Sequence, residues 1–300
     1  MIRIQPHRRG VSLRSIALLT VLALVLVACG DSGDSSNGET GGSDTGGSAT
    51  GGATGATSGL DTDKTYVIAT SADFPPMTFQ DPDNPGEVIG FEVDMMAALM
   101  GHLGLDYEWQ TMKFDGLLPA VQAGQVDMVV SDVYHTDERA EVVDFVDYIQ
   151  SGLAVMVTQA NASAITSYMD LCGKSMGILV GSPFEQEAAD TASAGCTDAG
   201  EPAIDIQTFQ AVADELPQLE NGRIDAILED VLSLSYIQQQ QPDTFAVTFI
   251  DPIQTKSGIV LNKSSTELMA ALEDAFQWYK DSGGYQENIE NWGIPESSMI

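Results

Sequence analysis

Apolar runs and helical patterns alternate along residues 61–300. Short apolar runs predict buried strands at residues 65–70, 126–130, 153–158, 175–180, 224–228 and 257–261, and residues 107–112 are a further strand candidate. Apolar residues at helical spacing predict helices at residues 91–103, 117–123 and 267–280. The methionines of the first helix are predicted to fill the core. Strands that alternate with helices are typical of a parallel α/β sheet.

Two fifteen-residue segments repeat one pattern at a constant offset of 98 residues. Residues 118–132 read LPAVQAGQVDMVVSD, and residues 216–230 read LPQLENGRIDAILED. Any α/β unit can resemble another over this length, but the aligned proline and both aspartates favour a duplicated architecture of two lobes. Ligands of open α/β sheets bind beyond the carboxyl ends of the strands. Asp132 and Asp230, which end the two segments, are therefore predicted to border one cleft.

The N-terminus predicts export. Residues 1–14 hold four arginines and no acid, and residues 16–28 are apolar except for Thr20. Thirteen residues are too few for a transmembrane helix, so residues 1–28 are predicted to be a secretory signal. Leu26-Val27-Ala28-Cys29 resembles the bacterial lipobox, which implies lipid attachment at Cys29 and an anchor on the outer face of the cell membrane. The alternatives are an ordinary signal peptide and, because of Arg8-Arg9, twin-arginine instead of general secretory export.

A linker and then a folded body follow the predicted signal. Residues 29–60 are nearly all Gly, Ser, Thr, Ala and Asp, a composition that cannot bury enough apolar surface to fold. Residues 61–300 are predicted to form the globular part. The chain has 12 Lys and Arg against 44 Asp and Glu, a formal net charge of -32. Such a surface repels phosphate backbones, so nucleic-acid binding is excluded, and the charge favours a soluble monomer.

Three cysteines bear on covalent structure. If Cys29 carries lipid, Cys172 and Cys196 remain, and a lone pair in an exported protein predicts a disulfide. Closing a loop of this length stabilises a fold by about 3 kcal/mol in the chain-entropy model. Two free buried thiols are the alternative. Only His102 and His135 follow the predicted signal, and they have no ligand spacing, so no metal site is predicted.

Sequence motifs for catalysis or cofactor binding are missing. Gly173-Lys174-Ser175 resembles the end of a phosphate-binding loop, but Tyr168 stands where that motif requires glycine. The chain has no metalloprotease, nucleophile-elbow or paired-cysteine motif. Neither a cofactor nor an enzymatic activity is predicted.

An ordered set of motifs resembles the family 3 extracellular solute-binding proteins, the amino-acid receptors of ABC importers. The set spans residues 61–300 and comprises Gly90-Phe91-Glu92-Val93-Asp94-Met95, Phe114-Asp115-Gly116-Leu117-Leu118-Pro119-Ala120, Gly124-Gln125-Val126-Asp127, Thr136-Asp137-Glu138-Arg139, Val143-Asp144-Phe145, Gly173-Lys174, Gly181-Ser182, Gly222-Arg223-Ile224-Asp225-Ala226, Asp230 and Trp292-Gly293. The resemblance implies two α/β lobes, residues 61–152 plus 256–300 and residues 153–255, which two hinge strands join and which close on a ligand.

The resemblance also implies a ligand set. Arg139 corresponds to the arginine that pairs with the ligand's α-carboxylate, and Asp230 to the aspartate that takes its α-ammonium. A guanidinium matches a carboxylate bidentately, although a surface ion pair of Arg139 is the alternative. Phe74 and Phe114 correspond to the aromatic residues that sandwich the ligand, with ordinary core positions as the alternative. The predicted ligand-binding set also includes Ser131, Asp132, Tyr134, Thr136, Ser182 and Glu229.

Departures from the family pattern concern the charge of the ligand. Asp132 stands where relatives usually have glycine, and Glu229 adds a second acid beside Asp230. Because a cleft closes over like charges only at high cost, these acids favour a cationic ligand, such as a basic amino acid or an amine. In the alternative interpretation, Asp132 turns away and caps the following loop. Pro183 lacks the backbone N–H that relatives often offer the carboxylate, and Ser71 replaces an aspartate of several relatives.

Two rival functions share the fold. A dehydratase of the cyclohexadienyl type would require an acid–base pair, which the sequence does not present. The sensor domain of a membrane receptor would require a transmembrane helix after residue 280, and the sequence to Ile300 contains none. The leading hypothesis is a lipid-anchored receptor that delivers an amino acid to the permease of an ABC importer.

Overall fold

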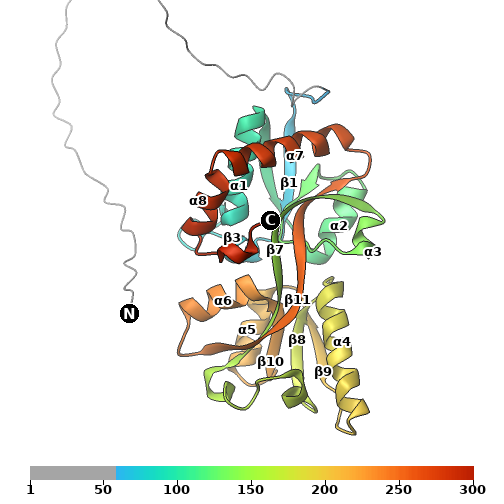
Figure 1. The fold of residues 1–300 in the computed structure, drawn as a ribbon, viewed down its shortest axis with the longest axis vertical. Coiled ribbons are helices and arrows are strands. Elements are labelled where there is room, and N and C mark those ends of the chain that lie inside the picture. Colours follow the sequence, from blue (N-terminus) through green and yellow to red (C-terminus); the bar gives the residue numbers. More distant parts are fainter. Residues whose placement is uncertain (1–58) are drawn as a thin grey trace, which may run out of the picture. The chain divides into compact units, whose positions relative to one another are not determined.

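The computed structural model describes residues 59–300, which form a mixed α/β fold (Figure 1). The predicted signal, Cys29 and the predicted linker up to residue 58 lie outside these residues. The strands are β1 Thr65–Thr70, β2 Asp73–Phe74, β3 Thr78–Gln80, β4 Val88–Ile89, β5 Asp106–Thr111, β6 Met128–Val129, β7 Val143–Thr158, β8 Ser175–Leu179, β9 Asp205–Phe209, β10 Ala226–Asp230 and β11 Phe245–Asn262. The helices are α1 Phe91–Leu103, α2 Phe114–Gln122, α3 Asp137–Ala140, α4 Pro183–Asp198, α5 Val212–Glu220, α6 Val231–Gln240, α7 Thr266–Asp281 and α8 Gly284–Asn291, with short 3₁₀ turns η1 Gln159–Asn161, η2 Tyr168–Leu171 and η3 Glu296–Ser298.

Eight of the described strands form one sheet in the order β5-β1-β6-β11-β7-β10-β8-β9. Strand β1 is parallel to β5 and β6, and β8 is parallel to β9 and β10. The two central strands, β7 and β11, are antiparallel to each other and to their outer neighbours. The prediction of a parallel sheet is therefore correct for the flanking strands and wrong for the centre, where the chain crosses and returns instead of completing a βαβ unit.

Two groups of elements flank the central strands (Figure 1). The β1 group contains β1 to β6 with α1, α2, α3, α7 and α8, and the β10 group contains β8, β9 and β10 with α4, α5 and α6. Strands β7 and β11 run from one group into the other and pair along most of their length, from Val143–Asn262 to Thr158–Phe245. Both are longer than predicted, and their register shifts between Ile250 and Gln254. Neither strand is interrupted at the predicted lobe boundaries near residues 153 and 256.

The repeated segments adopt the same local structure. Helices α2 and α5 are offset by the same 98 residues, and each contains the shared proline, Pro119 or Pro217. The first aspartate of each segment, here called the inner aspartate, also has the same role in both. Asp127 Oδ2 accepts a hydrogen bond from Val67 N in β1 at 2.9 Å, and Asp225 Oδ2 accepts one from Ser175 N in β8 at 2.9 Å. The predicted duplication of architecture is therefore present in these elements.

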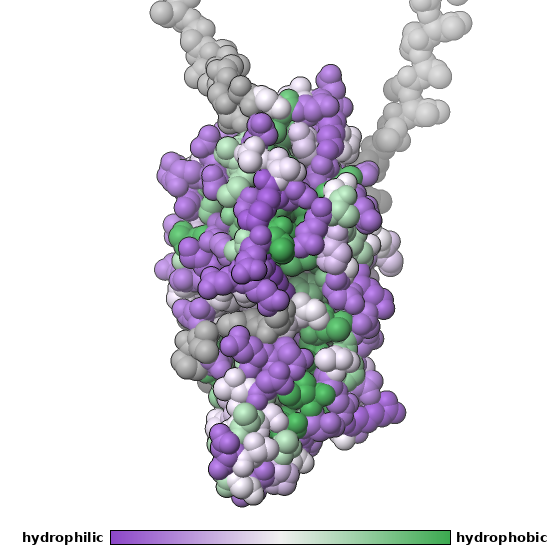
Figure 2. Space-filling view, turned by 90° about the vertical axis from the view of Figure 1, so that its right-hand side faces the viewer, coloured by the Kyte–Doolittle hydropathy of each residue, from purple (hydrophilic) through white to green (hydrophobic). Residues whose placement is uncertain are grey.

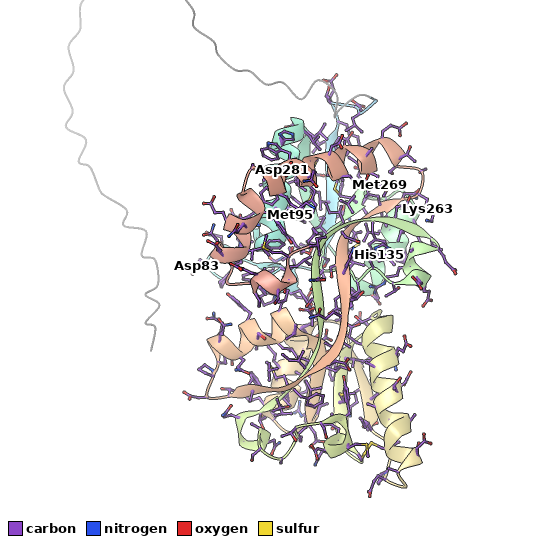
Figure 3. The ribbon with its side chains drawn as sticks, viewed as in Figure 1. Asp83, Met95, His135, Lys263, Met269 and Asp281 are labelled. Carbon is purple, nitrogen blue, oxygen red and sulfur yellow. A yellow bond between two sulfur atoms is a disulfide. The ribbon has the colours of Figure 1, made fainter. Side chains whose placement is uncertain are left out.

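Apolar side chains of helices and strands meet in the core on which the site rests. Helix α1, predicted with the same bounds, buries Met95, Met96 and Met100 completely, so the expectation that its methionines fill the core is confirmed. Figure 3 shows Met95, which is completely buried in this core, together with Asp83 and Asp281, which are exposed at the surface. On the face in Figure 2, hydrophilic side chains prevail and hydrophobic ones surface in smaller areas, as the negative net charge leads one to expect. No helix within residues 59–300 is both long and apolar enough to cross a membrane.

A disulfide joins Cys172 to Cys196, whose Cα atoms are 5.5 Å apart. It connects the segment after η2 to the last turn of α4, where Cys196 is completely buried. The predicted pairing is thus present, and it fastens α4 to the β10 group.

Candidate ligand-binding site

A small cavity lies between the β1 group and the β10 group. It is lined by ten residues: Phe74, Phe114, Ser131, Asp132 and Tyr134 from the first group, and Leu179, Ser182, Glu185, Glu229 and Asp230 from the second. Its volume is about 10 Å³, close to the space that one water molecule needs. An amino acid is far larger, so its entry requires the two groups to separate or the lining side chains to move.

The sequence predicted most of this lining. Eight of its members belong to the predicted ligand-binding set, and Leu179 and Glu185 are additional. Two predicted residues do not line it: Arg139 lies beside the cavity, and Thr136 lines a neighbouring open groove of about 640 Å³. A further groove of about 280 Å³ between α6 and the C-terminal segment contains one carboxylate, that of Asp251. The carboxylates of the 640 Å³ groove are exposed, so the small cavity is where buried carboxylates converge.

Strand ends bring the acids together. Ser131 and Asp132 come one residue after the end of β6. Glu229 and Asp230 are the last two residues of β10. Because both strands point their carboxyl ends at the boundary between the groups, their terminal side chains meet there. Ser131 also fixes the loop after β1, since its hydroxyl oxygen accepts a hydrogen bond from Ser71 N at 3.1 Å.

Asp230 is tied into the scaffold. It is the N-cap of α6, and its Oδ1 accepts hydrogen bonds from Leu232 N at 2.7 Å and Ser233 N at 3.3 Å. Its Oδ2 accepts a hydrogen bond from the Tyr134 hydroxyl at 2.6 Å, which links the two groups. Burial raises the pKa of Asp230, while these hydrogen bonds stabilise its ionised form.

Asp132 is held differently. Its backbone is left-handed, with φ 49°, and its side chain is 6% exposed. Neither carboxylate oxygen has a hydrogen-bond partner within residues 59–300. The capping alternative is therefore wrong, because the carboxylate faces the cavity without bonding the following loop. Burial, followed by the negative charges of Asp230 and Glu92, raises its pKa well above the usual range, although the nearby Ser257 hydroxyl opposes this shift.

Glu92, from the first turn of α1, holds the backbone of Asp132 in place. This completely buried carboxylate accepts a 2.6 Å hydrogen bond from Asp132 N and further ones from the hydroxyls of Thr78 and Tyr148. Glu92 lies in the family motif but was not predicted as a support of the site. Its three donors fix the backbone that presents the Asp132 carboxylate.

Further acids come from the β10 group. Glu229 is completely buried, and its Oε1 accepts a hydrogen bond from Leu179 N at 2.7 Å. Glu185, in the first turn of α4, is 5% exposed, and burial raises its pKa to about 7 although the positive charge of Arg139 opposes this shift. The cavity thus has four carboxylates in its lining.

Arg139 supplies the positive charge beside the cavity. It is the one buried basic side chain in the described part of the chain. Its Nη1 donates to Tyr134 O at 2.9 Å, and its Nη2 donates to Gly181 O of the β10 group at 3.1 Å. Its guanidinium carbon lies 5.9 Å from the centre of the Phe114 ring. The Thr136 hydroxyl accepts a hydrogen bond from Arg139 N at 3.3 Å, so Thr136 caps the short helix that holds the arginine.

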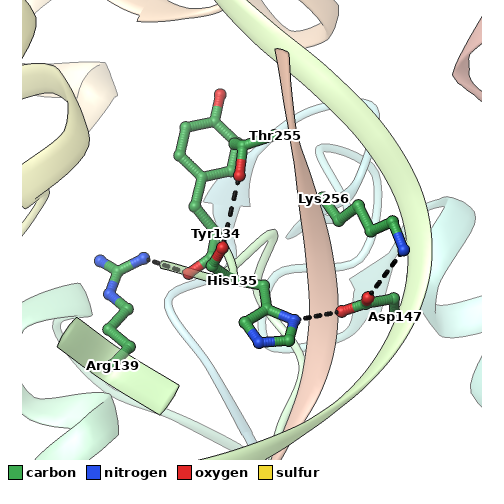
Figure 4. A network of polar contacts seen from close by, with 6 residues as sticks. All are labelled: Tyr134, His135, Arg139, Asp147, Thr255 and Lys256. Carbon is green, nitrogen blue, oxygen red and sulfur yellow. Dashed lines mark hydrogen bonds and ion pairs between the residues drawn. The ribbon is translucent and has the colours of Figure 1, made fainter. Parts of the chain in front are cut away.

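The loop that carries Tyr134 is fastened to the hinge strands (Figure 4). His135 N donates to Lys256 O of β11 at 2.7 Å, and His135 Nδ1 lies 2.7 Å from Asp147 Oδ1 of β7. Lys256 Nζ is 3.3 Å from the other oxygen of Asp147. Tyr134 and Arg139 are therefore positioned by the same two strands that connect the groups.

Metal coordination finds no support in the described residues, where no three His, Cys, Asp or Glu side chains group as ligands of one ion. The site instead contains three aromatic rings, one guanidinium and several buried carboxylates. Such a set can bind an organic ligand by cation–carboxylate pairs, a carboxylate–guanidinium pair and ring contacts.

Known proteins share the whole described fold. The sequence pattern of the bacterial extracellular solute-binding proteins, family 3, matches residues 66–295. The L-cystine-binding protein TcyJ of Escherichia coli (strain K12) is 30% identical over 229 residues, which are 76% of this chain and 82% of TcyJ. An ancestral arginine-binding protein bound to arginine has a TM-score of 0.68 and 32% identity, covering 76% of this chain and 97% of its own. The substrate binding protein of an amino acid ABC transporter has a TM-score of 0.68 and 30% identity, covering 76% and 99%.

Proposed function

The chain belongs to the bacterial extracellular solute-binding proteins of family 3, and we propose that it captures a positively charged amino acid for an ABC importer. Relatives named for cystine and for arginine support an amino-acid ligand, the arginine-binding ones support its positive charge, and one that serves an amino acid ABC transporter supports the partner. In this proposal, residues 61–152 plus 256–300 and residues 153–255 are the lobes, and the small cavity is the closed ligand site.

The environment of the Asp132 carboxylate is the single observation that supports a positively charged ligand. It faces Asp230 across the cavity, is almost completely buried and has no hydrogen-bond partner within residues 59–300. Two buried carboxylates at one site repel each other, and a cation between them removes this cost. The proposed α-ammonium site is therefore formed by Asp132 and Asp230.

Arg139 is the proposed partner of the ligand's α-carboxylate. A guanidinium has five N–H donors, and the hydrogen bonds to Tyr134 O and Gly181 O use two of them. The other donors suffice for a bidentate pair once the groups separate and the ligand enters. Pro183, the first residue of α4, has no N–H to add, which leaves Arg139 with most of this role. The rings of Phe74 and Phe114 are proposed to flank the ligand.

Titration calorimetry with a panel of amino acids tests the proposal. Arginine is expected to bind at least a hundredfold more tightly than glutamate, because glutamate adds negative charge to an acidic cavity. Arg139→Ala is expected to weaken arginine binding at least a hundredfold, since it leaves the ligand carboxylate unpaired. Arg223→Ala, which changes an exposed arginine, is the matched control and should bind as the wild type does. Tighter binding of glutamate, or unchanged affinity in Arg139→Ala, would refute the assignment.

We also propose that the protein binds its ligand without converting it and works as a monomer. Asp230 is already engaged by α6 and Tyr134, so it is poorly placed to transfer protons. Incubation with a cyclohexadienyl substrate and with arginine, followed by mass spectrometry, should return both unchanged. Formation of an aromatic product would establish the rival dehydratase activity.

Lipid attachment at Cys29 is the proposed anchor to the outer face of the membrane. Its support is the lipobox-like Leu26-Val27-Ala28-Cys29 and the linker composition that follows. Cys29→Ala should move the protein from the membrane fraction to the medium or periplasm. Retention of this variant in the membrane fraction would refute the anchor.

A further inference from the structure

A second set of acids lies in the β10 group, beyond the Asp132–Asp230 pair. Glu185 in α4, Glu215 in α5 and Glu229 in β10 come from three elements, and none is more than 5% exposed. Both carboxylate oxygens of Glu215 and the Oε2 of Glu229 have no hydrogen-bond partner in residues 59–300. Glu229 lines the cavity, so this oxygen is within reach of a bound molecule.

These acids are close enough to affect one another. Burial, then the charges of Glu215 and Glu185, raise the pKa of Glu229 well above its usual range. Burial, then the charges of Glu185 and Asp73, raise the pKa of Glu215 in the same way. Asp73 belongs to β2 in the β1 group, and its Oδ1 also has no partner among the described residues. The acidic set therefore reaches both sides of the boundary between the groups.

Within residues 59–300, buried protein cations neutralise this set only in part, because the charge of Arg139 acts on Glu185. Arg139 is the one buried basic residue within residues 59–300. Two of its N–H groups donate hydrogen bonds to the carbonyl oxygens of Tyr134 and Gly181. Buried carboxylates without partners are expensive to keep ionised, so they either hold protons or receive a cation from outside. Glu229 and Asp230 are consecutive in β10, and side chains of consecutive strand residues leave in opposite directions. Both acids line the cavity, but Glu229 is fixed to Leu179 N of β8 and Asp230 to the first N–H groups of α6, so a cation at Glu229 is distinct from one at Asp230.

We propose that Glu229, backed by Glu215 and Glu185, is a distal cation subsite that binds the side-chain guanidinium or ammonium of the ligand. The inference rests on the proposed function, in which Asp132 and Asp230 hold the α-ammonium. The ligand class is then an amino acid with two cationic groups and one carboxylate, such as arginine, lysine or ornithine. The far end of cystine carries a carboxylate beside its second ammonium and so has no net positive charge, which is why the subsite disfavours it.

Arginine and citrulline make the sharpest test, because citrulline replaces the guanidinium with a neutral group of nearly the same shape. Calorimetry on the mature wild-type protein should show at least hundredfold tighter binding of arginine than of citrulline. Glu229→Gln should reduce this ratio below tenfold and change citrulline affinity less than threefold. The substitution keeps an oxygen for Leu179 N, so the fold should be retained. Glu215→Gln should reduce the ratio as well, and it serves if Glu229→Gln proves unstable.

Glu273→Gln, which changes an exposed glutamate of α7, is the matched control and should preserve both affinities. Equal binding of arginine and citrulline by the wild type, or tighter binding of cystine than of arginine, would overturn the subsite and leave an amino-acid receptor standing. A ratio preserved in both glutamine variants would overturn it too. Failure of arginine, lysine and citrulline all to bind would refute the proposed function, and the subsite with it.

Discussion

The two repeated segments, residues 118–132 and 216–230, begin alike and end differently. In both, a proline-containing helix leads through a left-handed glycine, Gly124 or Gly222, to an aspartate that holds the neighbouring strand. At the final aspartate the two diverge. Asp230 starts a helix and bonds its first N–H groups, whereas Asp132 starts a loop and its carboxylate has no hydrogen-bond partner among the described residues.

The residues that follow explain the divergence. After Asp230, the chain continues as α6, so free N–H groups at the helix start point at the carboxylate. After Asp132, the chain pairs with β11 instead, through a bridge between Tyr134 and Ser257 and a hydrogen bond from His135 N to Lys256 O. One segment thus makes its last aspartate part of the scaffold, and the other leaves the aspartate available to a ligand. Shared sequence at two positions thus does not imply the same structural role, although both aspartates belong to the proposed α-ammonium site.

Removal of Asp230 should have the largest effect of any change at these positions. Asp230→Ala removes the N-cap of α6 and the acceptor of the Tyr134 hydroxyl, which together should lower the free energy of unfolding by about 2 kcal/mol. Arginine binding should fall at least a hundredfold. Urea denaturation and calorimetry measure the two effects. Asp230→Asn separates them, because asparagine caps helices as well as aspartate does but carries no charge, so only binding should fall. Equal stability of Asp230→Ala and the wild type would contradict the scaffold role.

Asp132→Asn should affect binding alone. Because the Asp132 carboxylate has no hydrogen bond to lose and is costly to ionise, the variant should unfold at the same denaturant concentration or a higher one. Arginine affinity should fall at least tenfold, as one of two acids at the α-ammonium is neutralised. Asp137→Asn, at an exposed position five residues later, is the control. Wild-type affinity in Asp132→Asn would remove the difference between the two aspartates on which the proposed site depends.

Lowering the pH should raise the stability of the ligand-free protein and lower its affinity for arginine. Burial raises the pKa of Glu185 to about 7, while a carboxyl in the unfolded chain titrates near 4.5. The folded, ligand-free protein thus binds this proton more tightly, so the added stability is complete below about pH 4.5 and is lost as the pH rises through 7. A cation requires the ionised form, so arginine affinity should be highest above pH 7 and fall by up to tenfold per unit below it. Thermal melts and calorimetry between pH 5 and 8 test both slopes, and an affinity that rises with acidity would contradict the acidic site.

The inner aspartates should give the smallest effects, and equal ones. Asp127→Ala and Asp225→Ala each remove an acceptor from a backbone N–H of a neighbouring strand, and each should lower the free energy of unfolding by about 1 kcal/mol. Neither should change arginine affinity more than twofold. Denaturation of the two variants side by side measures the match. A difference of several kcal/mol between them would show that the two segments are not equivalent even where their hydrogen bonds coincide.

Local pattern was sufficient to predict some elements and insufficient for others. Strand β1 and helix α1 have the predicted bounds, because one is a continuous apolar run and the other has a buried stripe at helical spacing. The first part of β7, residues 143–152, escaped prediction because Asp144, Asp147 and Gln150 interrupt its apolar residues, whereas residues 153–157 are a continuous apolar run. Helix α4 escaped because its buried face consists of small residues, Ala189, Ala192 and Cys196, which give a weak apolar signal.

The residues of the candidate site also divide into those that the sequence predicted and those that it did not. The residues that family motifs mark came together at the cavity, although which of them bind a ligand stays a prediction. Glu185 and Glu215 were not predicted, since charged residues in an acidic chain read as solvated positions. Ser182 followed three residues later by Glu185, with Pro183 between them, is typical of a helix start and would have located α4. That these glutamates are buried depends on the packing of α4 and α5 against the sheet, which no local pattern contains.

The continuous pairing of β7 with β11 also bears on recombination. Gly152 pairs with Gln254, so the hundred or so residues between them leave and re-enter the chain at adjacent points of one ladder. A segment whose ends are neighbours can be inserted into a host, or exchanged between hosts, with little disturbance of the flanking structure. The β10 half, with Glu229, Asp230 and the disulfide, can therefore be replaced as one unit in a designed chimera. A chimera joined at residues 152 and 254 would carry the acids of one parent onto the Arg139 of another.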